Sequence, residues 1–221
     1  MRNIILILLI LVGLYSCNNK DNNESNTINK SAFLPMSDGN YWVYQYYVID
    51  SNGIEYPENY YDSVVITNDT SINGKKYFRY DFYEDYRENQ KPDFSRSVYY
   101  FDSSKCLVNN FGRIVFSEDN FVDTICRVTQ LNNSISGDTI GWTTFKMERM
   151  DGIVIVPAGS FSNLLNYRGT FVGNPKHCSI SKKYTNQYYS KNVGLILSSF
   201  FYDQPDPNSN EKRLLRYKIN K

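Results

Sequence analysis

The sequence predicts an all-β domain in which a curved antiparallel sheet closes toward an open half-barrel or a sandwich. Aromatic residues make up 16% of the chain, and 20 of them are tyrosines. Tyr, Phe, Val and Ile favour strands, whereas the Asn and Gly residues that cluster between the apolar stretches favour turns. No window of ten residues keeps a helical period, and short apolar segments recur instead. We therefore expect about ten or eleven strands in an antiparallel meander.

The first sixteen residues have the organisation of a secretory signal peptide. Arg2 and the amino terminus supply positive charge, Ile4–Leu14 is apolar, and the small residue Ser16 precedes Cys17. The apolar run is shorter than the about 20 residues that a membrane-spanning helix needs, so an N-terminal membrane helix is the less favoured alternative.

The segment Leu14-Tyr15-Ser16-Cys17 resembles the lipobox of bacterial lipoproteins. The resemblance implies cleavage between Ser16 and Cys17, acylation of Cys17, and attachment to the envelope of a Gram-negative bacterium, with the outer membrane expected. Tyr15 departs from the small residue that is usual there. Each buried CH₂ of an acyl chain contributes about 0.8 kcal/mol, so several chains on one residue hold a protein firmly on a membrane.

The mature chain divides into a polar tether and one folded domain. Residues 17–31 carry the anchor cysteine and a polar segment that cannot form a core, and residues 32–221 carry the β-rich domain. The chain has 24 Lys+Arg and 23 Asp+Glu, and removing Arg2 with the signal leaves 23 of each. A neutral domain without a basic block is not expected to bind nucleic acid.

Three strands are expected before residue 90. Tyr41–Ile49 alternates aromatic residues on both faces, and the turn at Asn52-Gly53 leads to a second strand over about Tyr60–Thr67. The turn at Asn73-Gly74 precedes Lys76–Tyr86, in which apolar and polar residues alternate with period 2.

The later strands are shorter and separated by polar or Gly-containing turns. They are expected at Ser97–Phe101, Cys106–Val108, Arg113–Phe116, Ile125–Leu131, Trp142–Met150, Ile153–Val156, Ser160–Phe171, Lys183–Ser190, Leu195–Tyr202 and Arg213–Ile219. Gly159 in the turn Pro157-Ala158-Gly159 is expected to have a positive φ.

Six aromatic side chains on two of these strands form a candidate ligand face. They are Trp42, Tyr44, Tyr46, Phe78, Tyr80 and Phe82. Such a face suits an apolar or glycan ligand, because binding sites are concave and lined by aromatic residues. The alternative is an ordinary core in which tyrosines bury their rings and keep their hydroxyls near water, which burial statistics favour.

Three cysteines remain after Cys17, namely Cys106, Cys126 and Cys178. An exported protein can form disulfides. Cys106–Cys126 is the pairing considered first, because a short loop is the easiest to close. The other two pairings, or three unpaired thiols acting as small apolar residues, remain open.

No pattern predicts catalysis or metal binding. The single histidine is His177, and neither a His-Glu-x-x-His nor a Cys-x-x-Cys motif occurs. Asp81 and Asp85 are expected on one strand face about 13 Å apart, too far for a pair of glycosidase carboxylates, so both are interpreted as solvated charges. We expect no catalytic residue, no metal site and no cofactor, and therefore a protein that is not an enzyme.

Several short motifs occur in an order that resembles a widespread set of uncharacterised envelope lipoproteins. The motifs are Pro35 with Gly39-Asn40-Tyr41-Trp42-Val43-Tyr44, Asn73-Gly74-Lys75-Lys76-Tyr77, Gly137-Asp138-Thr139, Pro157-Ala158-Gly159-Ser160-Phe161, and Tyr188-Tyr189 with Val193-Gly194-Leu195-Ile196. The resemblance implies a curved antiparallel sheet similar to the open half-barrel of periplasmic lipoprotein carriers. It implies no activity.

These observations predict a lipid-anchored, non-enzymatic binding or carrier module of the cell envelope. Its partners would be the membrane, through acylated Cys17, and a small apolar or glycan ligand. The alternative is a structural or interaction subunit that contacts another envelope protein through a sheet edge or an aromatic face.

Overall fold

A computed structural model describes residues 31–131, 137–201 and 208–220 of the chain. Its strands are β1 (Tyr41–Ile49), β2 (Glu55–Ile72), β3 (Lys75–Tyr86), β4 (Phe94–Ser103), β5 (Cys106–Asn109), β6 (Ile114–Ser117), β7 (Cys126–Leu131), β8 (Thr139–Met150), β9 (Val154–Val156), β10 (Gly159–Phe161), β11 (Leu164–Gly173), β12 (Lys182–Thr185), β13 (Gln187–Ser190), β14 (Gly194–Phe200) and β15 (Ser209–Lys218). The described ranges contain no helix, and so none that could cross a membrane. The all-β prediction is confirmed, although the strands number fifteen rather than ten or eleven.

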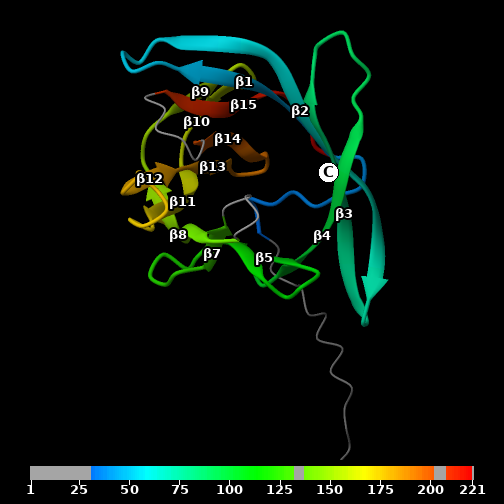
Figure 1. The fold of residues 1–221 in the computed structure, drawn as a ribbon. Helices are drawn as coiled ribbons and strands as arrows, with labels where there is room; N and C mark the ends of the chain where they lie inside the picture. Colours follow the sequence, from blue (N-terminus) through cyan, green and yellow to red (C-terminus); the bar gives the residue numbers. More distant parts are fainter. Residues whose placement is uncertain (1–30, 132–136, 202–207, 221) are drawn as a thin grey trace, which may run out of the picture.

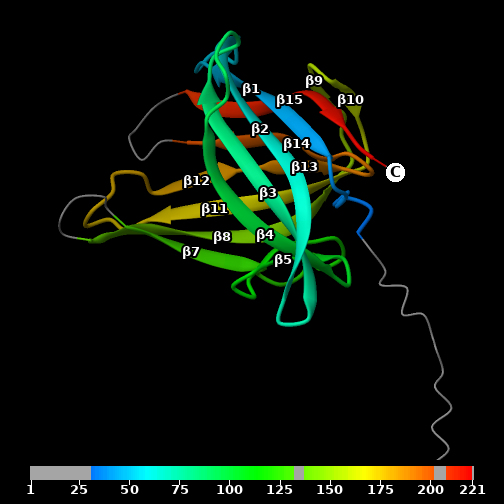
Figure 2. The same ribbon diagram turned by 90° about the vertical axis from the view of Figure 1, so that its right-hand side faces the viewer.

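Thirteen strands form one curved antiparallel sheet. Its order is β6-β5-β4-β3-β2-β1-β15-β14-β13-β11-β8-β7, and β12 pairs with β11 beside this path. Figures 1 and 2 show the two ends of the sheet curling toward each other, so that the sheet encloses an interior. The strands at the ends, β6 and β7, are not hydrogen-bonded to each other, which leaves a seam in an otherwise nearly closed barrel. The predicted curved sheet is therefore confirmed, and it forms a barrel rather than a sandwich.

Side-chain packing closes the seam where hydrogen bonds do not. Leu107 of β5 and Phe116 of β6 share a buried cluster with Met147 of β8 and Leu165 of β11. Phe116 is fully buried and its ring centroid lies 4.6 Å from that of Tyr189. Apolar burial of this kind stabilises the barrel without constraining its register across the seam.

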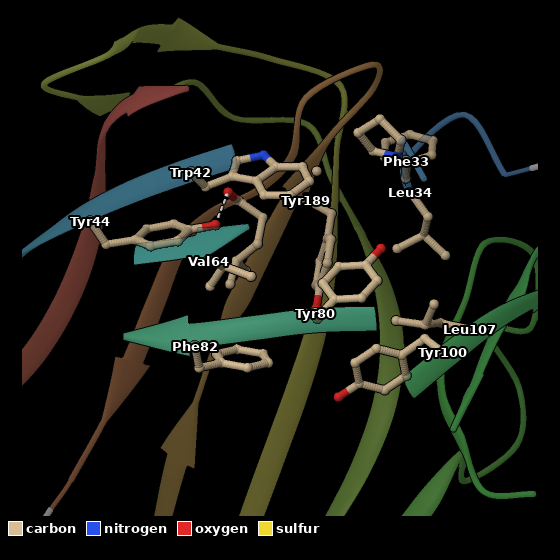
Figure 3. A pocket seen from close by; sticks show the side chains of 13 residues that line it. Phe33, Leu34, Trp42, Tyr44, Val64, Tyr80, Phe82, Tyr100, Leu107 and Tyr189 are labelled. Atoms are coloured by element: carbon tan, nitrogen blue, oxygen red, sulfur yellow. Dashed lines mark hydrogen bonds between the residues drawn. The ribbon is translucent and has the colours of Figure 1, made fainter. Parts of the chain in front are cut away.

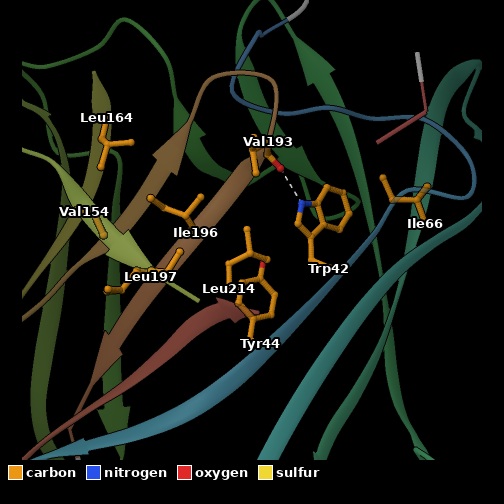
Figure 4. Packing of buried hydrophobic residues seen from close by; sticks show 10 residues of the cluster. Trp42, Tyr44, Ile66, Val154, Leu164, Val193, Ile196, Leu197 and Leu214 are labelled. Carbon is orange, nitrogen blue, oxygen red and sulfur yellow. Dashed lines mark hydrogen bonds between the residues drawn. The ribbon is translucent and has the colours of Figure 1, made fainter. Parts of the chain in front are cut away.

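The larger core lies on the side of β1, β14 and β15 and is shown in Figure 4. Ile196 and Leu214 are fully buried there, and the indole Nε1 of Trp42 donates a hydrogen bond to the Val193 carbonyl at 2.6 Å. The separate two-stranded sheet of β9 and β10 contributes Val154 to the same cluster. The hydrogen bond ties β1 to the turn between β13 and β14, across 151 residues of sequence.

The second strand begins at Glu55, earlier than the predicted start at Tyr60, and contains Pro57. Pro57 pairs with Tyr47 of β1, whereas the last pair that β2 makes with β3 is at Tyr61. At Pro57, therefore, β2 pairs with β1 but not with β3. Because no strand lies on the β3 side, the missing N–H of the proline costs no ladder hydrogen bond there.

Two predicted strands are each broken at an asparagine. The segment predicted as Ser160–Phe171 divides at Asn163, which has a φ of 53°, into β10 and β11. The segment predicted as Lys183–Ser190 divides at Asn186, whose backbone N–H binds the Ser199 hydroxyl at 2.8 Å. Asparagine tolerates the left-handed region and makes local hydrogen bonds, so it interrupts a strand that the apolar pattern alone would continue.

The predicted turns that contain glycine are found. Asn73 and Gly74 have φ values of 51° and 75°, as a two-residue hairpin turn requires. Gly159 has a φ of 140°, which confirms the predicted positive value.

Candidate functional site

The interior of the barrel contains an apolar cavity of about 220 Å³ that we call the aromatic cavity (Figure 3). Its walls come from both halves of the sheet. They are Trp42, Tyr44, Val64, Tyr80, Phe82, Tyr100, Leu107, Tyr189, Gly194 and Leu195, together with Phe33, Leu34 and Pro35. The volume exceeds the about 150 Å³ of a dry apolar cavity that accommodates benzene.

The rings around the cavity hold one another in place. The planes of Trp42 and Tyr80 lie within 8° of parallel with centroids 6.5 Å apart, and Tyr80 meets Tyr100 edge-on at 5.2 Å. Edge-to-face and stacked aromatic pairs contribute about 0.5–1.5 kcal/mol beyond the area they bury. The cavity is thus walled by ordered rings.

Four tyrosine hydroxyls belong to this wall. Tyr44 donates to the Leu195 carbonyl at 3.0 Å and Tyr189 to the Gln187 side-chain oxygen at 3.3 Å. Within the described ranges, the hydroxyls of Tyr80 and Tyr100 have no hydrogen-bond partner. These two groups can therefore bond a polar atom of a ligand.

Burial raises the pKa of Tyr44, Tyr80, Tyr100 and Tyr189 above the ordinary value of about 10. Neighbouring tyrosines add to the effect at Tyr44, Tyr80 and Tyr189. All four phenols remain neutral hydrogen-bond donors over the physiological pH range.

Residues 31–36, which begin at the last residue of the predicted tether, close one end of the aromatic cavity and are called the floor segment. The Ser31 backbone N–H binds the Asp102 carboxylate at 2.7 Å, and the Ala32 carbonyl accepts from Asn192 at 2.7 Å. Leu34 is buried, and Figure 3 shows Phe33 and Leu34 beside the cavity. A second cavity of about 520 Å³, lined by Pro35 and Phe78 among others, lies against the same segment.

On the side away from the floor segment, the aromatic cavity adjoins a charged cavity of about 500 Å³. The two cavities share Tyr44, Val64, Phe82 and Leu195. The second is lined in addition by Tyr46, Asp62, Glu84, Asp85, Arg96, Gln187, Ser198, Phe200 and Lys212. The barrel interior therefore changes from apolar near the floor segment to charged at the other end.

Asp62 is the most enclosed carboxylate of the charged cavity. It forms an ion pair with Lys212 and accepts the Asp85 backbone N–H at 3.0 Å. The Tyr46 hydroxyl lies 3.1 Å from Asp62 and 2.9 Å from the Asp85 carboxylate. Burial, the charge of Asp62 and the hydrogen bond to Asp85 raise the pKa of Tyr46 far above its ordinary value. Because the hydroxyl lies within hydrogen-bond distance of both carboxylates, its one proton is shared between them.

A register shift brings Asp85 to this position. In the pairing with β2, the partners shift from Ser63–Tyr83 to Tyr61–Tyr86, so β3 carries one extra residue between Tyr83 and Tyr86, and Asp85 there has a φ of 56°. Such irregularities re-aim side chains. The prediction that Asp81 and Asp85 lie on one strand face is wrong, because at this bulge Asp85 lines the charged cavity beside Glu84.

Asp81 is buried rather than solvated, which also corrects the sequence interpretation. It accepts hydrogen bonds from Thr67 at 2.8 Å, Arg79 at 2.8 Å and Ser97. Burial alone would raise its pKa, but these hydrogen bonds outweigh it and lower the pKa below the ordinary value. This network lies on the face of β3 opposite Tyr80, so it supports the barrel wall.

All six aromatic residues of the candidate ligand face line the interior cavities. Trp42 and Tyr80 line the aromatic cavity, Tyr44 and Phe82 line both that cavity and the charged one, Phe78 lies at the floor segment and Tyr46 at the charged end. Sequence reasoning did not assign Tyr100, Tyr189 or Lys212 to the site, although Tyr189 belongs to one of the motifs named above. The alternation in β4 and β15 carries a signal for Tyr100 and Lys212, but only the sheet order brings these distant strands together.

The three later cysteines line neither the aromatic nor the charged cavity. Ser16 and Cys17 lie outside the described residues. Cys106, Cys126 and Cys178 are all unpaired, and the Cys106 sulfur lies 3.4 Å from the Ser117 hydroxyl. The predicted Cys106–Cys126 disulfide is not formed in this structure, in which both cysteines are free.

Metal-binding groups do not cluster in the described ranges. No group of three His, Cys, Asp or Glu side chains there could hold a metal ion. His177 lies 3.8 Å from Asp138, and neither residue lines the aromatic or the charged cavity.

Comparison with known proteins relates the chain to two solved structures. No model of a known protein family matches it, and no curated protein matches. A structure from Parabacteroides distasonis ATCC 8503, provisionally described as a lipoprotein, has 13% sequence identity, covers 84% of this chain and 98% of its own, and has a TM-score of 0.51. A structure from Bacteroides fragilis NCTC 9343, provisionally described as an exported protein with a YmcC-like fold, has 11% identity, the same coverages and a TM-score of 0.47. At this identity the first likeness shows a shared fold.

Proposed function

We propose that this protein is a lipid-anchored, non-enzymatic binding or carrier module of the cell envelope that holds the apolar part of a small ligand inside its barrel. The aromatic cavity carries the proposal. A concave, largely apolar site with a few polar groups is the usual form of a small-molecule site. Tyr80 and Tyr100 supply such polar groups here.

The anchoring part of the proposal rests on the lipobox-like segment that ends in Cys17. The provisional description of the Parabacteroides structure as a lipoprotein agrees with an envelope location. The described fold begins at Ser31, a short polar segment after Cys17, so the floor segment would be the part of the barrel joined directly to the anchor.

Contact quenching of tryptophan fluorescence tests ligand binding at this site. Of the two tryptophans, Trp42 lines the aromatic cavity, whereas Trp142 of β8 does not and lies under the Arg127 guanidinium at 5.0 Å. In the acylated Trp142→Phe protein in lipid nanodiscs, decanol with a terminal bromine should quench Trp42 saturably. If brominated decanol quenches Trp42 no more strongly than it quenches a surface tryptophan in the same nanodiscs, the proposed site is rejected.

One observation favours the alternative of an interaction subunit. Ile153 and Ile155 are 69% and 71% exposed on and beside β9, in the small sheet that pairs only with itself. Replacing both with Asp should leave ligand binding intact and, if this face contacts an envelope protein, should remove a partner that cross-links to the wild type.

A further inference from the structure

The interior is built in two chemically different parts, so the ligand that fits it is an amphiphile. The aromatic cavity can hold an apolar chain or ring, and it adjoins the charged cavity, with which it shares the lining residues Tyr44, Val64, Phe82 and Leu195. A ligand that fills both would place a polar head beside the charged residues. This inference rests on the proposed function and identifies the class of ligand.

The charges at that end are unequal. Three carboxylates, those of Asp62, Glu84 and Asp85, face two basic side chains, Arg96 and Lys212. Farther out, Lys91 and Asp93 line the adjoining cavity and cancel each other. By formal charge the end therefore carries one excess negative charge.

Both basic groups already have partners. Lys212 pairs with Asp62, and its ammonium lies 4.7 Å from the ring centroid of Tyr46 and 5.7 Å from that of Phe200. The Arg96 guanidinium pairs with Glu84 and covers the Phe82 ring at 4.7 Å. An anionic head would have to compete with these carboxylates and displace the cations from their aromatic rings.

Asp85 is the carboxylate left in excess. It is exposed, it has no basic partner within 4.0 Å among the described residues, and it shares the single Tyr46 proton with Asp62. A charged donor from a ligand would complete its hydrogen bonds, and hydrogen bonds with an ionised partner are stronger than neutral ones.

We propose that the barrel binds a cationic amphiphile, with its apolar part in the aromatic cavity and an ammonium or guanidinium head at Asp85. An amphiphile with an anionic head of the same length is excluded by the excess negative charge. The orientation places the head at the end away from the floor segment and the anchor.

The test compares decylammonium, decanol and decyl sulfate as competitors of the brominated decanol in the Trp42 quenching assay. Decylammonium should bind about tenfold more tightly than decanol, and decyl sulfate more weakly than decanol. Asp85→Asn, which keeps the shape of the side chain, should remove the tenfold advantage of decylammonium over decanol. Asp151→Asn removes the same charge from an exposed turn and should change nothing.

The outcomes separate the two proposals. Binding of decanol with no preference for decylammonium, or a preference that survives in Asp85→Asn, overturns the cationic head while the proposed function stands. Failure of all three compounds to compete at Trp42 overturns the proposed function itself. The preference should also weaken as salt is raised from low to high ionic strength, because Asp85 is exposed.

Discussion

Filling the junction of the two cavities should block the ligand without damaging the barrel. Val64 lines both cavities, and Val65, its neighbour on β2, points to the opposite face and pairs across the sheet with Asp81. Val64→Phe adds about four carbon atoms to the interior, and each excluded ligand methylene costs about 0.8 kcal/mol. The expected loss is about 3 kcal/mol, a weakening of affinity on the order of 100-fold.

The assay is the Trp42 quenching titration with brominated decanol. Val65→Phe is the matched control, because it adds the same ring to the outer face, and it should bind as tightly as the wild type. Leu195→Phe fills the same junction from β14 and guards against misfolding of Val64→Phe, which circular dichroism and thermal melts would detect. Wild-type affinity in a folded Val64→Phe protein would refute the placement of the ligand.

Three further predictions concern the stability of the fold and the state of its cysteines. Asp81 has a lowered pKa in the fold, so the stability that it contributes is present above its unfolded pKa and is lost as the pH falls through its folded pKa. The free energy of unfolding should therefore decline in acid, and Asp81→Asn should be less stable at pH 7 and should lose less stability on acidification. An unchanged dependence of stability on pH in Asp81→Asn would contradict the hydrogen-bond network. Cys106 and Cys126 should both react with a thiol reagent after unfolding without reductant, and a protected pair would show a disulfide. Leu214→Ala should cost about 2–5 kcal/mol in urea unfolding because Leu214 is fully buried. Leu131→Ala, at a residue that is 56% exposed, should cost under about 0.5 kcal/mol, and equal losses for the two would contradict the assigned core.

The alternation of residues in β1 and β3 was enough to predict one wall of the site. Trp42 and Tyr44 fall on one face of β1, and Tyr80 and Phe82 fall on one face of β3, because side chains alternate along a strand. The sheet order then brings both faces to the interior. Glycine turns such as Asn73-Gly74 were also predictable, because the Asn-Gly pair by itself favours the positive φ values of a hairpin turn.

What the sequence could not show depends on long-range contacts. Tyr189 reaches the cavity only because β13 and β4 lie on opposite walls of the barrel, and strand pairing of that kind has no local signature. Asp85 was misplaced because alternation assumes an unbroken register, and the extra residue between Tyr83 and Tyr86 puts Asp85 on the same side as its neighbour Glu84. Asp81 was expected in solvent because its three donors come from residues up to 16 positions away.

The most direct test of the account is native mass spectrometry of the protein extracted gently from its own membrane, beside a Cys17→Ala form. The account predicts a mature chain that begins at an acylated Cys17 and carries a stoichiometric small molecule, and the Cys17→Ala form should lack the acyl mass. An acylated protein without any bound small molecule would contradict the binding module, and a chain without acylation at Cys17 would contradict the anchor.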